Sequence, residues 1–160
     1  MLDGSIIKVH QDAMRCDLDK DEEGIGASVG GLSTKIHAKV DAFGQLITLI
    51  LSPGQVHDSQ FAFEAYNNEP CDYFLADKAY DIDAFREQLV ADGVTPVIPS
   101  KKNRKDPQKC DKHIYKERNI VERFFQKIKR FRRISTRYDK TARMYATGVM
   151  MISILMAIRL

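Results

Sequence analysis

Residues 115–129 read YKERNIVERFFQKIK, the most strongly patterned stretch of the chain. On a helix with about 100° per residue, four polar side chains share one strip about 60° wide. They are Tyr115, Arg118, Glu122 and Lys129. Apolar side chains lie on the opposite side, where they can pack on a core: Ile120, Phe124, Ile128 and Phe131. The pattern predicts an amphipathic helix from about residue 112 to 132.

Glu122 is an isolated carboxylate among many cations in this strip. A solvated polar ridge is the simpler interpretation of such a face. A lone acid among cations also suits a site where the carboxylate binds a metal ion and the cations face phosphate. The helix alone leaves both interpretations open.

The charges of the chain are divided unevenly along its length. Residues 101–143 carry 17 Lys and Arg against 5 Asp and Glu, whereas the remaining residues carry 8 against 17. A basic third joined to an acidic remainder favours a polyanion partner, with nucleic acid preferred over a merely solvated basic surface. The 160 residues, 44% of them hydrophobic, are enough for one domain with its own core.

The chain shows no sign of a membrane span or a disulfide framework. The apolar run at residues 145–158 is too short to cross a bilayer, so a buried helix is expected there. Three widely spaced cysteines imply no set of disulfides, which fits a reducing cytoplasm.

The order of predicted elements indicates an α/β fold. Alternation in LSTKIHAKVD (32–41) predicts a half-buried strand, and the turn at 42–44 joins it to a second strand at 45–51. Asp58 is expected to cap a helix that extends to residue 67. The other expected elements are strands at 1–10, 73–76 and 95–98, a loop at 12–31, and helices at 82–92 and 141–160. A mixed sheet with helices on its faces follows from this order.

Three acids come from separate, well-defined places in this arrangement. Asp3 lies in the first strand, Asp77 ends a strand, and Glu122 lies on the basic helix. Taken singly, each acid is more simply a surface or capping residue. Together they offer hard oxygen ligands for Mg²⁺ or Mn²⁺, and two such ions can clamp both reacting oxygens of a phosphodiester.

The sequence resembles the catalytic part of the DDE transposases of bacterial insertion sequences, in the insertion-sequence-5 group. The family's spacing of Tyr, Arg, Glu and Lys is matched without a gap by Tyr115, Arg118, Glu122 and Lys129. FLADKAYD is similar to the segment with the family's second aspartate, which falls on Asp77, and LDGSIIKVHQ to the segment with the first, which falls on Asp3. The resemblance covers nearly the whole chain.

This resemblance implies an RNase H-like fold, in which a five-stranded mixed sheet flanked by helices brings the three acids together within one domain, residues 1–160. It implies metal-dependent DNA cleavage and strand transfer at the ends of an insertion sequence, with Asp3, Asp77 and Glu122 as catalytic ligands of two Mg²⁺ or Mn²⁺ ions. Homo-oligomers on DNA and a place at the bacterial nucleoid are also implied.

The resemblance further implies which residues hold DNA, both at the element ends and at the target. Tyr115, Arg118 and Lys129 are expected near the cleaved phosphate. Backbone contacts without sequence readout are expected from Lys101, Lys102, Arg104, Lys105, Arg130, Arg132 and Arg133. Family members carry a helical DNA-binding region before the first aspartate, which is expected to be missing here. The alternative is therefore a catalytically idle DNA-binding fragment, or a second-frame product that needs its upstream partner region.

Overall fold

The computed structural model describes residues 1–14 and 19–158. Its main sheet is built on two antiparallel pairs, because β3 (Gly31–Val40) pairs with β1 (Leu2–Val9) on one side and β4 (Leu46–Pro53) on the other. Short β2 (Gly26–Ser28) also pairs with β3, within the region predicted as a loop. β7 (Thr136–Arg137) pairs with β1 in parallel and was not predicted. Those parts of the predicted loop and last helix that fall on residues 15–18 and 159–160 lie outside the described residues.

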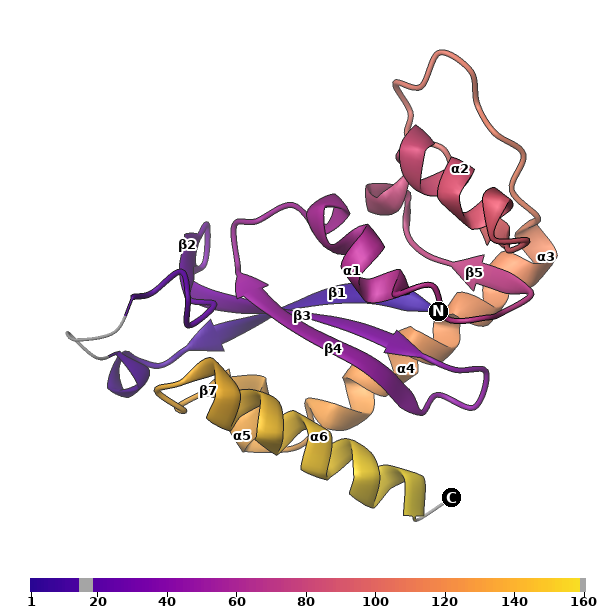
Figure 1. Cartoon of the computed structure of the whole chain (residues 1–160). Coiled ribbons are helices and arrows are strands. Elements are labelled where there is room, and N and C mark those ends of the chain that lie inside the picture. The colour runs from indigo at the N-terminus through magenta and orange to yellow at the C-terminus, as the bar shows by residue number, and fades with distance from the viewer. Residues whose placement is uncertain (15–18, 159–160) are drawn as a thin grey trace.

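The second half of the chain adds a small parallel sheet of β5 (Tyr73–Leu75) and β6 (Thr95–Val97). A single parallel bridge between Leu2 and Ala76 joins this pair to the start of β1. The five-stranded sheet is therefore made of β1, β2, β3, β4 and β7, which corrects the expected membership, because β5 and β6 form a sheet of their own. The result is a mixed α/β arrangement in which the start of β1 lies beside β5 and the helical segment 112–128 (Figure 1).

Helices cover both faces of the main sheet (Figure 1). One face carries the short helix η2 (Asp58–Phe61) with α1 (Ala62–Tyr66). After these in sequence come η3 (Lys78–Tyr80) and α2 (Asp83–Ala91), and α2 packs against β6. The other face carries α4 (Asn119–Ile128), α5 (Arg132–Ser135) and α6 (Ala142–Ile158). A single turn, η1 (Gln11–Ala13), follows β1.

β3 is buried on both of its faces, which corrects the prediction of a half-buried strand. Ile36, Ala38 and Val40 pack in the core under α4 and α6, as the alternation predicts. The alternating polar side chains point to the other face and are covered there instead of meeting solvent. Lys39 donates to the carbonyl of Tyr66 at the end of α1 (2.8 Å), because a buried ammonium needs an oxygen partner.

The predicted long helix at 112–132 is broken into several pieces. α3 (Lys112–Tyr115) leads through the tight turn η4 (Lys116–Arg118) into α4. Phe124 and Ile128 are buried as predicted, together with Val121 and Phe125. Phe131 is exposed, contrary to prediction, because the helix ends before it and the chain turns into α5.

α6 is only partly buried, although its sequence is apolar nearly all round. Tyr145, Val149 and Ser153 face the molecule, whereas a stripe on the other side is open to solvent. The stripe consists of the exposed apolar side chains Met144, Met150, Met151, Ile154, Leu155 and Ile158. Among the described residues, no helix is both long and apolar enough to cross a membrane.

Candidate active site

Asp3 lies near the start of β1 on the face that packs against α4. It shares this face with Ile7, because side chains alternate along a strand. One carboxylate oxygen accepts a hydrogen bond from the Gly4 amide (2.9 Å), and the other accepts from Arg118 Nη1 (2.9 Å). Asp3 is therefore a largely covered carboxylate with a cation across from it.

Arg118 connects two of the three predicted acids. Its Nη1 binds Asp3 while its Nη2 binds Glu122 one helical turn away, so one guanidinium joins β1 to α4. Arg118 also lies over the ring of Tyr115, 5.6 Å from its centroid. Burial alone would lower the pKa of Arg118, but the charges of Asp3, Tyr115, Glu122 and Asp77 outweigh burial and raise it.

Asp77 lies on the chain segment beside Asp3. Leu2 and Ala76 form a parallel bridge, and Asp3 and Asp77 are the residues that directly follow them. The Asp77 carboxylate caps η3 by accepting from the Lys78 amide. Burial raises the pKa of Asp3; Arg118 opposes this shift, and the negative charge of Asp77 adds to it. A nearby positive charge therefore stabilises the ionised form of Asp3.

The three acids do not form a closed metal cage in the part of the chain that the structure describes. No three Asp, Glu, His or Cys side chains of residues 1–14 and 19–158 are grouped closely enough to hold a metal ion. The chemistry of the donors nevertheless suits a hard divalent cation, because the candidate ligands are all carboxylates and one of them is desolvated. The guanidinium of Arg118 is the positive charge that lies between Asp3 and Glu122.

A layer of buried polar groups lies on the face of β1 and β3 opposite to Asp3. The sequence did not indicate this layer. Lys35 Nζ lies 2.7 Å from Asp58 Oδ1 and donates to the Val56 carbonyl. A Cβ on residue 4 would lie 3.2 Å from Asp58 Oδ1, so the Asp58 carboxylate packs directly against Gly4. Asp58 is thus not the helix cap that was predicted, because the His57 side chain accepts from the Ser59 amide instead.

His37 belongs to the same buried layer. Its Nε2 lies 2.9 Å from Ser52 Oγ, its Nδ1 lies 3.5 Å from the Tyr80 hydroxyl, and its ring packs on Phe61. Burial lowers the pKa of His37 to about 4; the charge of Asp58 acts against this shift and that of Lys35 reinforces it. The alternation of Lys35, His37 and Lys39 in the sequence was the available signal, but it equally describes a solvated strand face.

Some of the expected DNA-binding residues have exposed side chains, whereas others are partly buried or bind a carboxylate of the domain. Lys101, Lys102, Lys105, Arg130 and Arg132 are exposed. Lys129 is half-buried at the end of α4, and burial lowers its pKa. Arg133 is exposed but binds Asp139, which lies between β7 and α6; the distance from Nη2 to Oδ1 is 2.7 Å.

Arg104 is largely occupied in holding the basic loop between β6 and α3. Its Nη1 binds the buried carboxylate of Asp81 (2.7 Å), which also accepts from the Lys101 amide and from Arg86. Burial would raise the pKa of Asp81, but these hydrogen bonds lower it below its usual range. Asp81 therefore acts as the anchor of a loop that exposes lysines.

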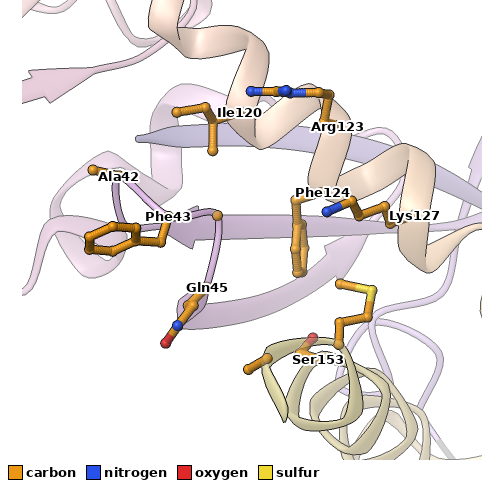
Figure 2. A pocket seen from close by; sticks show the side chains of 11 residues that line it. Ala42, Phe43, Gln45, Ile120, Arg123, Phe124, Lys127 and Ser153 are labelled. Carbon is orange, nitrogen blue, oxygen red and sulfur yellow. The ribbon is translucent and has the colours of Figure 1, made fainter. Parts of the chain in front are cut away.

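A separate cleft of about 150 Å³ lies on the other flank of α4, between the β3–β4 turn and α6 (Figure 2). Phe43 and Gln45 come from the turn, Arg123 and Lys127 from α4, and Ser153 from α6. None of Asp3, Asp77 and Glu122 lines this cleft. The cleft therefore contains none of the predicted catalytic acids, although its two cations extend the basic surface of α4.

Comparisons with known proteins identify relatives of the chain. The family model described as "Transposase DDE domain" matches residues 1–157. A protein of Brucella ovis, named as a transposase for insertion sequence element IS6501, is 35% identical over 112 residues, which are 69% of this chain and 86% of that protein. No solved structure matches the chain. The match over nearly its whole length establishes that the chain belongs to the DDE transposase domain family.

Proposed function

We propose that residues 1–160 form the single catalytic domain of an insertion-sequence transposase of the insertion-sequence-5 group, with an RNase H-like fold. The domain cleaves DNA at the ends of the element and joins the freed 3′-hydroxyl to target DNA by in-line displacement. One observation supports this proposal most: a single guanidinium links Asp3 to Glu122, while Asp77 is set beside Asp3 by the bridge from β1. Two carboxylates from distant parts of the chain thus share one guanidinium, and the third follows the strand position that is bridged to β1.

Each residue of the site has a role in this proposal. Asp3, Asp77 and Glu122 would hold Mg²⁺ or Mn²⁺, and bound ions supply activation of the attacking oxygen and stabilisation of the leaving 3′-oxygen. Tyr115, Arg118 and Lys129 hold the strand near the cleaved phosphate, since they share the polar strip with Glu122. The exposed lysines of the loop anchored by Asp81 bind backbone phosphates without reading sequence.

The exposed stripe of α6 supports assembly of two copies on DNA. No charged side chain occurs from Met144 to Ile158, so two such helices can pack without burying an unpaired charge. Met144, Met151 and Ile158 repeat every seven residues over roughly 20 Å of helix, which is the spacing of a helix–helix seam. A two-fold axis would place the same stripe on both sides of the contact.

A strand-cleavage assay tests the catalytic proposal. The substrate is a duplex that carries the ends of the element encoding the chain, with Mg²⁺ present. Glu122→Gln should abolish nicking and leave DNA binding intact or slightly stronger, because it removes a ligand charge from a phosphate-binding surface. Glu117→Gln, an exposed acid in the preceding turn η4, is the matched control and should nick normally.

A second candidate function, an idle DNA-binding fragment, is favoured by the neutralisation of Asp3 and Glu122 by Arg118 in this structure. It predicts that the chain binds the duplex and cleaves nothing. Cleavage that persists in Glu122→Gln would contradict both candidates, since neither allows catalysis without this carboxylate.

A further inference from the structure

We infer that Arg118 is an internal substitute for a divalent ion, and that it couples the binding of DNA to the binding of metal. Without DNA its guanidinium occupies the oxygens of Asp3 and Glu122. When DNA binds, a phosphate takes over the guanidinium and frees both carboxylates for the ion. This inference rests on the proposed function, because it concerns the same three acids.

The first step is that Arg118 and a metal ion compete for the same atoms. Nη1 binds Asp3 Oδ2 and Nη2 binds Glu122 Oε1, so the guanidinium contacts one oxygen of each candidate ligand. The pair is shielded, with 16% of the Arg118 side chain and 19% of the Asp3 side chain exposed. An ion placed between these carboxylates would meet a like charge at close range, where screening by water is weak. The two cations therefore exclude each other.

The second step is that the guanidinium has another anion to bind. Arg118 ends η4, directly before α4, and lies beside Tyr115 on the predicted polar strip that also carries Lys129. The strip opens to solvent on its Glu122 side, where 47% of that side chain is exposed. A guanidinium can form bidentate hydrogen bonds with phosphate as it does with carboxylates. DNA at this strip therefore offers Arg118 a replacement partner.

The third step is a thermodynamic consequence with a definite sign. If phosphate withdraws Arg118 from Asp3, then DNA must tighten metal binding, and metal must tighten DNA binding by the same factor. A purely structural ion pair between β1 and α4 predicts the reverse for a variant that loses it, because a loosened Asp3 would bind metal less well. The effect of removing Arg118 on metal affinity distinguishes the two roles.

Titration of the full chain with Mn²⁺, followed by the electron paramagnetic resonance signal of free Mn²⁺, measures that effect. Arg118→Gln should bind Mn²⁺ about 10- to 100-fold more tightly than the unmodified chain without DNA, the range set by one charge-assisted hydrogen bond. Saturating duplex DNA should tighten Mn²⁺ binding to the unmodified chain by a similar factor, and that gain should be absent in Arg118→Gln. Arg123→Gln, an exposed cation on the other flank of α4, should behave as the unmodified chain does.

The outcomes separate this inference from the proposed function beneath it. Equal or weaker Mn²⁺ binding by Arg118→Gln would overturn the substitute role and leave the acids as ligands. Mn²⁺ binding that is unaffected by Asp3→Asn would overturn the proposed site itself. Arg118→Lys keeps a cation but loses the fork, so it should bind Mn²⁺ with intermediate affinity, and it replaces Arg118→Gln if that variant does not fold.

Discussion

The buried imidazole of His37 should make the domain less stable as the pH falls from about 6.5 to 4. Burial lowers the pKa of His37 from 6.5 to about 4, with Asp58 opposing and Lys35 adding to the shift. In that window the unfolded chain takes up a proton that the folded chain does not. The free energy of unfolding therefore decreases as the pH decreases. At about 1.4 kcal/mol per pKa unit, the loss across the window is about 3 kcal/mol.

Urea unfolding followed by circular dichroism, in half-unit steps from pH 7 to pH 4, measures this loss. His37→Gln keeps a polar side chain beside Ser52 and Tyr80 but cannot titrate, so its stability should change about 3 kcal/mol less than that of the unmodified chain. His113→Gln, which removes an exposed imidazole on α3, serves as the control. An identical pH dependence in the unmodified chain and His37→Gln would refute the buried polar layer as described.

Three further predictions concern packing, DNA binding and assembly. Gly4→Ala should lower the free energy of unfolding by about 1–3 kcal/mol, because its Cβ would lie 3.2 Å from Asp58 Oδ1; an unchanged urea midpoint would contradict that contact. Affinity for duplex DNA should fall steeply between 50 and 200 mM salt and depend little on sequence, since the exposed cations contact only phosphates; salt-insensitive binding in a filter assay would contradict this assignment. Met151→Glu should lower the molar mass measured by light scattering on DNA, whereas Val90→Glu, which changes an exposed apolar side chain of α2, should not; equal effects would exclude the α6 stripe as the contact.

The parts of the fold that the sequence predicts depend on short-range patterns. Alternation in β3 and β4 with a turn between them predicts the hairpin, and the helical period predicts which side of α4 is buried. The breaks at η4 and after Ile128 carry no comparable signal, because the charged residues there suit a helix equally well, namely Lys116, Glu117, Arg118, Arg130, Arg132 and Arg133. Phe131 was therefore placed in the core although it is exposed.

The remaining features depend on contacts between distant residues, which no local pattern encodes. Lys35 and Asp58 are 23 positions apart, so their pairing depends on how η2 and α1 cover β3. The Tyr–Arg–Glu–Lys spacing predicts that Arg118 and Glu122 share one strip of a helix. It does not predict that Arg118 reaches Asp3, 115 positions away, because that contact arises only when α4 packs on the start of β1.

Anomalous scattering from Mn²⁺ in crystals of the chain bound to duplex DNA tests the metal-binding claim most directly. An anomalous peak is expected within about 2.5 Å of carboxylate oxygens of Asp3 and Asp77, the distance of a metal–oxygen bond. Arg118 is expected to have left Asp3 and to contact a phosphate. Mn²⁺ bound only away from Asp3, Asp77 and Glu122 would contradict the proposed metal site.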